Sequence, residues 1–187
     1  MPNGRMNREV TTTAVGLVLD ATTLRPLAGL WVEAWDAKTG EPAWQVKLEA
    51  AGKALHAPCG GSDGSVMYFS GGTDNAKDGG GETVAIDPKT GKALWRNNQF
   101  YCPGCAPPVV KDGRVLLAGW DTPMSCLSAK DGQLMWRGQK NASYWFNGPS
   151  VGPDFFTGRG YGGHSVRFNL RDGTADDRIM VGAQGFS

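Results

Sequence analysis

The sequence has no excess of charge of either sign. Its 187 residues include 19 Lys and Arg against 18 Asp and Glu, which gives a formal net charge of +1. A protein that binds phosphate backbones or anionic membranes through its overall charge carries a large basic excess. We therefore expect no nucleic-acid partner.

Long apolar runs and cysteines are also scarce. No stretch approaches the roughly 18 consecutive apolar residues of a membrane-spanning helix. Residues 1–5 lead into polar sequence without the apolar core of a secretory signal. Four cysteines are too few for a disulfide framework at this length. We expect no membrane insertion and no signal peptide in this chain.

Glycine and proline, in contrast, are abundant. The 28 Gly and 11 Pro are spread along the chain rather than gathered in one linker, and 40% of the residues are hydrophobic. Such a composition predicts a folded domain that is rich in turns and built from β-strands.

A repeated hairpin sequence is the strongest signal. Residues 35–44 read WDAKTGEPAW, residues 86–95 read IDPKTGKALW and residues 127–136 read LSAKDGQLMW. A weaker fourth copy follows, with Asp177 at the position of the final tryptophan. The first interval is longer than the others because of an insertion near residues 74–82, which we interpret as a solvated loop. A fixed period with insertions confined to loops indicates stacked copies of one unit.

Each unit reads as a strand, an Asp-Gly turn, a second strand and then the tryptophan hairpin. Four short antiparallel strands in about 40 residues is the size of one propeller blade. We therefore predict an all-β fold, a β-propeller of about four blades in a partial or incomplete ring. The predicted ranges are an N-terminal arm at 1–14 and repeats over 15–187, with blades at about 15–50, 55–100, 105–141 and 146–182.

The hairpin sequence resembles the repeat of pyrroloquinoline-quinone-like (PQQ-like) β-propellers. The shared pattern is a small residue, an Asp two positions later, and then x-x-Thr-Gly-Lys-x-x-Trp, and the resemblance covers about residues 15–182. In that family the tryptophan docks one blade on the next, which assigns this role to Trp44, Trp95 and Trp136. Because the family usually closes its ring with about seven or eight blades, the resemblance implies a protein partner, self-association or a longer protein that completes the propeller.

Two alternatives concern the N-terminal part. Residues 16–36 are also similar to the opening strands of carboxypeptidase-regulatory-like and transthyretin-like sandwiches, although the same stretch serves as the front half of a first blade. Residues 10–13 have high β propensity and are interpreted either as an outer strand of the last blade or as a frayed arm.

Four residues have the inventory of a zinc site. His56 and Cys59 are spaced His-x-x-Cys, and Cys102 and Cys105 are spaced Cys-x-x-Cys. Both pairs precede the first, innermost strand of adjacent blades, so their side chains are candidates to converge. A Cys102–Cys105 disulfide and unpaired thiols remain open alternatives. Cys126 takes the small-residue position of the repeat and is interpreted as buried packing.

A second candidate is a set of aromatic side chains that the repeat pattern does not explain: Trp120, Tyr144, Trp145 and Phe146. The last three belong to the run 141–147 between the third and fourth blades. Loops between blades reach a propeller face, where such side chains can bind a ligand. Packing in the core is the alternative.

Every well-formed motif thus has a structural assignment, and no catalytic residue is predicted. We expect a noncatalytic scaffold or a module that binds a ligand or protein, without a cofactor. One alternative is a fragment of a quinone-dependent alcohol or sugar dehydrogenase with PQQ and calcium, although the adjacent cysteine pair and the Asp base of such enzymes are not found. Another is a zinc-stabilised interaction domain. The resemblance implies a periplasmic or extracellular location.

Overall fold

The computed structural model is built from β-strands. It describes residues 10–16, 30–50, 53–72, 81–101, 107–119, 122–138, 150–159 and 165–176. Every regular element in these ranges is a strand, so the predicted all-β class is confirmed. None of these residues forms a helix that could span a membrane.

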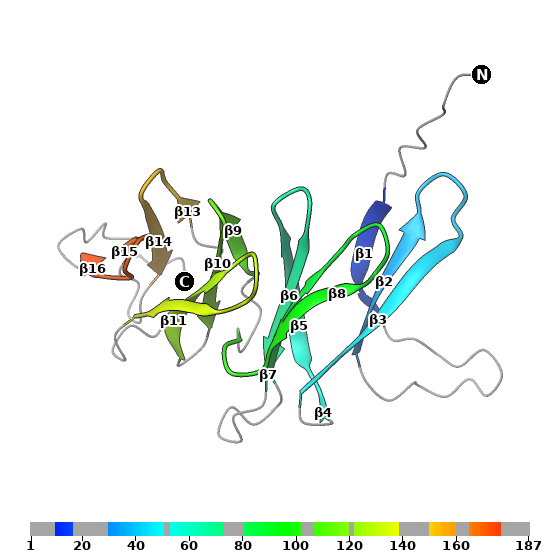
Figure 1. Ribbon diagram of the computed structural model, residues 1–187, viewed down its shortest axis with the longest axis horizontal. Helices are drawn as coiled ribbons and strands as arrows, with labels where there is room; N and C mark the ends of the chain where they lie inside the picture. The colour runs from blue at the N-terminus through cyan, green and yellow to red at the C-terminus, as the bar shows by residue number, and fades with distance from the viewer. Residues whose placement is uncertain are drawn as a thin grey trace, which may run out of the picture.

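The strands form four antiparallel sheets, each made of four consecutive strands (Figure 1). Sheet 1 contains β1 (Val10–Gly16), β2 (Leu30–Asp36), β3 (Pro42–Ala50) and β4 (Lys53–Ala54). Sheet 2 contains β5 (His56–Ser62), β6 (Met67–Gly72), β7 (Gly81–Ile86) and β8 (Ala93–Asn97). Sheet 3 contains β9 (Val109–Lys111), β10 (Arg114–Gly119), β11 (Thr122–Ser128) and β12 (Leu134–Arg137). Sheet 4 contains β13 (Ser150–Val151), β14 (Phe155–Arg159), β15 (Ser165–Asn169) and β16 (Ala175–Asp176).

The four sheets follow one another in an open row, with sheet 1 and sheet 4 at its opposite ends (Figure 1). This arrangement confirms the predicted partial propeller. β1 pairs with β2, and Val10 lies opposite Asp36. Residues 10–13 therefore belong to the first sheet and do not add an outer strand to the last one. The first sheet begins within the span 1–14 that the sequence analysis predicted as an arm.

The same tight hairpin recurs in all four sheets, where it joins β2 to β3 in sheet 1 and the third strand to the fourth in sheets 2 to 4. In sheet 2, the carboxylate of Asp87 accepts hydrogen bonds from the Lys89 amide and the Thr90 hydroxyl, which lower the pKa of Asp87. The hairpin then needs a left-handed residue, a conformation that glycine adopts without steric cost. All four hairpins place a glycine there, with φ between 71° and 72°: Gly40, Gly91, Gly132 and Gly173.

Three apolar cores lie between consecutive sheets. Successive side chains of a strand point to opposite faces, so Ile86 packs toward sheet 1 while Ala85 packs toward sheet 3. The buried residues of the first core are Val32, Leu48, Leu55, Met67, Phe69, Val84 and Ile86. Those of the second are Tyr68, Ala85, Val115, Leu117 and Leu127. Those of the third are Leu116, Met124, Cys126, Trp136, Phe156, Phe168 and Leu170. Each inner sheet is therefore covered on both faces.

Small side chains at one repeated position allow neighbouring sheets to pack closely. Ala34, Ala85 and Cys126 are each fully buried. We expect Ala85→Leu to lower the free energy of unfolding by about 1–3 kcal/mol, because extra methylene groups in a packed core force their neighbours apart. Urea denaturation monitored by circular dichroism measures this loss. Ala43→Leu, on the exposed side of β3, is the control, and equal midpoints for the two variants would contradict the packing.

Candidate functional site

The predicted zinc ligands are only partly described. The backbone of His56 lies on β5 opposite Gly72, and Cys59 lies on the same strand opposite Ser70. Cys102 and Cys105 lie outside the described residues. Across the ranges that the structure describes, no three His, Cys, Asp or Glu residues gather as metal ligands would. The zinc site therefore stays a prediction.

The other residues singled out from the sequence are also described only in part. The aromatic candidates Trp120, Tyr144, Trp145 and Phe146 all lie outside the described residues. Cys126 is buried in the core between sheets 3 and 4. Burial raises the pKa of its thiol to about 12, which leaves it uncharged and inert near neutral pH.

The residues that the structure does bring together are the tryptophans of the repeat and the hairpins of the following sheet. Trp44 belongs to β3, but its indole Nε1 donates a hydrogen bond to the carbonyl oxygen of Pro88 in the β7–β8 hairpin, at 2.8 Å. Its ring lies on Gly91 of that hairpin, where a Cβ atom would be 2.7 Å from ring carbons. One side chain of sheet 1 thus binds sheet 2.

The same contact recurs at the next two interfaces. Trp95 Nε1 donates to the carbonyl of Ala129 at 2.9 Å, and Trp136 Nε1 donates to the carbonyl of Leu170 at 3.0 Å. The rings lie on the hairpin glycines Gly132 and Gly173, respectively. An indole site is defined by two groups: the hairpin glycine, and the backbone carbonyl of the residue three positions before it. We use this term for each such pair.

Glycine is required at an indole site for two reasons. Its φ is in the left-handed region, and any side chain would overlap the ring that covers it. The indole gains burial of a large ring and a partner for its N–H, which a buried indole needs. At the second interface a further hydrogen bond joins the sheets, from Asn97 Nδ2 to the carbonyl of Gly132 at 2.8 Å.

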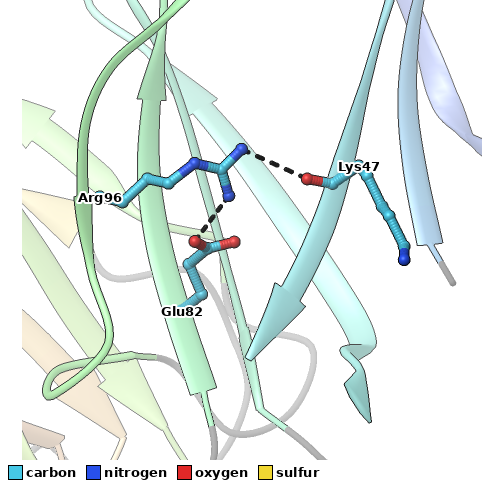
Figure 2. A network of polar contacts seen from close by, with 3 residues as sticks. All are labelled: Lys47, Glu82 and Arg96. Carbon is cyan, nitrogen blue, oxygen red and sulfur yellow. Dashed lines mark hydrogen bonds and ion pairs between the residues drawn. The ribbon is translucent and has the colours of Figure 1, made fainter. Parts of the chain in front are cut away.

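A polar network also joins sheets 1 and 2 (Figure 2). Glu82 on β7 is buried, with 2% of its side chain exposed, and pairs with the Arg96 guanidinium at 2.6 Å. The other guanidinium nitrogen donates to the backbone carbonyl of Lys47 on β3, at 3.3 Å. Arg96 therefore neutralises a carboxylate of its own sheet and binds the backbone of the neighbouring one.

The prediction of a solvated insertion was wrong for Glu82. This residue lies on β7 and is buried in the interface. A signal was present, because Glu82 alternates with Val84 and Ile86 and so shares their face of β7. The structure leaves its second oxygen, Oε2, without a hydrogen-bond partner among the described residues.

Removal of the Arg96 charge tests this network. We expect Arg96→Met to lower the free energy of unfolding by about 1–3 kcal/mol, because the buried carboxylate loses a charge-assisted hydrogen bond while the partly exposed site screens the loss. Chemical denaturation measures the effect. The control is Arg171→Met, which removes an arginine charge at an exposed hairpin position of sheet 4. If the double variant Glu82→Gln/Arg96→Met were no more stable than Arg96→Met, the pairing argument would be wrong.

Comparison with known proteins identifies the repeat. A sequence profile of the family described as outer membrane protein assembly factor BamB matches residues 29–176. A comparison with curated proteins finds no match. Among solved structures, BamB from Moraxella catarrhalis is similar, with a TM-score of 0.61 and 17% identity over 89% of this chain and 50% of that one.

Two enzymes are similar in fold as well. A europium-containing methanol dehydrogenase has a TM-score of 0.57 and 13% identity, over 78% of this chain and 37% of that one. The quinohemoprotein alcohol dehydrogenase ADHIIG from Pseudomonas putida HK5 has a TM-score of 0.54 and 15% identity, over 89% of this chain and 34% of that one. The chain thus spans half or less of the length of these proteins, and such low identities bear on the fold alone. Since the profile matches most of the chain, and the repeated hairpins carry the expected tryptophans, the chain belongs to the PQQ-like repeat family of β-propellers represented by BamB.

Proposed function

We propose that this chain is a noncatalytic binding module whose blades present surfaces to a protein partner. The proposal rests on the contacts that the repeat tryptophans make. Trp44, Trp95 and Trp136 are engaged at indole sites between sheets, so their rings hold the scaffold together instead of stacking on a ligand. The match to a family described as an assembly factor supports a role in protein binding.

A quinone-dependent dehydrogenase is the competing proposal, since two solved neighbours are enzymes of that kind. In the part of the chain that the structure describes, no donor set fits the cofactor. No two cysteines are adjacent in the sequence, and the described residues contain no cluster of three side chains suited to hold calcium. We therefore derive no reaction step through a quinone.

A zinc-stabilised domain is a second candidate, and one contact favours it. A Cβ atom on Gly61 of β5 would collide with the carbonyl of Pro108. The backbone three residues after Cys105 therefore lies directly beside the strand that carries His56 and Cys59. This proximity supports the zinc proposal, because a shared zinc ion needs ligands from both segments close together.

Location and assembly follow from the same family. We propose a periplasmic or extracellular location, which the description as an outer membrane protein assembly factor supports. We also propose that a protein partner or a second copy completes the propeller. The open row of sheets and the coverage of half of BamB support this assembly.

A dye-reduction assay tests the noncatalytic role. The purified chain is incubated with PQQ, calcium, an alcohol or sugar and an artificial electron acceptor. We expect no saturable dye reduction, because the sequence has no adjacent cysteine pair. Saturable reduction would overturn the proposal. Mass spectrometry of the dialysed chain measures zinc in parallel. A stoichiometry near one would favour the zinc-stabilised domain, and its absence would exclude it.

A further inference from the structure

The hairpin of sheet 1 has the backbone of a fourth indole site. Gly40 has a φ of +72°, as Gly132 and Gly173 do. Its amide donates to the carbonyl of Asp36 at 2.8 Å, and the Asp36 carboxylate accepts from the Lys38 amide at 2.8 Å. The hairpin is therefore already in the conformation that accepts an indole at the other three sites.

This fourth site is open. Gly40 is exposed, whereas the other three hairpin glycines are buried. No atom of the described residues lies within 4 Å of a Cβ built on Gly40. The carbonyl that would accept the indole N–H belongs to Ala37, which is also exposed. Both elements of the site thus face solvent on the outer side of sheet 1.

A large apolar side chain lies on the same sheet, five residues before the glycine. Trp35 is 39% exposed. The residues at this repeat position in the other sheets are at most 1% exposed, because the preceding sheet covers them: Ile86, Leu127 and Phe168. An aromatic ring left open in this way is the kind of anchor that protein interfaces bury.

Sheet 4 of a second copy would not supply the missing indole. In sheet 4 the position of the docking tryptophan is occupied by Asp177, whose carboxylate has no N–H to donate. The buried small residue is replaced by Arg167, which lies 3.9 Å from the Phe155 ring centroid and 3.6 Å from the Asp154 carboxylate. Sheet 4 therefore offers a charged face where the open site takes an indole.

We propose that the outer face of sheet 1 binds a tryptophan-bearing hairpin of a PQQ-like repeat that belongs to a partner protein. The partner's indole ring lies on Gly40, its N–H donates to the carbonyl of Ala37, and its sheet covers Trp35. This inference rests on the proposed binding function and names the surface and the chemistry of the partner. The three occupied indole sites provide the geometry.

The test uses a hairpin probe made from the chain itself. A cyclised peptide of residues 122–138 carries Trp136, with Cys126→Ala to avoid oxidation, and cyclisation holds it in the bound shape. It is titrated into the full-length, isotope-labelled chain and followed by NMR. We expect the Hα resonances of Gly40 to move upfield, toward those of Gly91, Gly132 and Gly173, because an indole ring then lies on each of the four glycines.

Matched variants separate this contact from nonspecific binding. A peptide with Trp136→Ala, and one with 1-methyltryptophan at position 136, should each lose affinity by at least about tenfold, since the ring or its N–H donor is gone. Trp35→Glu in the chain should cause a similar loss. The control is Leu94→Glu on β8, where the native side chain is 52% exposed, and this variant should bind as the native chain does.

Three outcomes would overturn the proposal. Gly40 resonances unmoved at millimolar peptide would show that the site takes no indole, and shifts confined to other glycines would place the binding elsewhere. A dimer in light scattering, with Gly40 already shifted and reverted by Arg167→Glu, would make a second copy the occupant. None of these three outcomes would contradict the noncatalytic role. Dye reduction together with peptide binding at Gly40 would contradict the noncatalytic role and leave the indole site at Gly40 supported.

Discussion

The contact between an indole ring and a glycine of the next sheet is the interaction on which this fold depends. Both faces of each inner sheet bury mostly apolar side chains, so each sheet must be covered by its neighbours. The apolar cores supply most of that burial but do not select a register between sheets. The indole does, because its N–H reaches a carbonyl at a fixed place in the next hairpin and its ring fits only on glycine. One side chain at each interface thereby sets the spacing and direction of the row.

This contact has a direction, and the direction distinguishes the two ends of the row. Every hairpin can accept an indole, but only sheets 1 to 3 provide one. Stability in such an array is approximately a sum of contacts between nearest neighbours, with the terminal units differing from the rest. Sheet 1 therefore retains an accepting hairpin, whereas sheet 4 presents Arg167 on the face where its predecessors present a small residue. The binding function proposed here follows from this difference between ends.

Much of this could be predicted from the sequence, because the same residue has the same local role in every copy. The repeated spacing of Trp44, Trp95 and Trp136 predicted the hairpin and the blade, and the chain length, set against the usual ring size of the family, predicted a partial ring. Features that depend on a neighbouring sheet were not predictable in this way. The burial of Glu82 is decided by β3 and Arg96, and the exposure of Gly40 by the lack of a sheet before it among the described residues. The zinc ligands and the aromatic candidates stay predictions, since Cys102, Cys105 and the aromatic residues lie outside those residues.

The most direct test of the account compares two tryptophans. The free energy of unfolding of Trp95→Ala, measured by urea denaturation, reports the loss of a ring that joins sheets 2 and 3, and that of Trp35→Ala reports the loss of a ring on an open face. We expect the free energy of unfolding to fall by about 3–5 kcal/mol for Trp95→Ala and by about 1 kcal/mol or less for Trp35→Ala. Equal costs for the two variants would contradict the claim that indole contacts hold the sheets together.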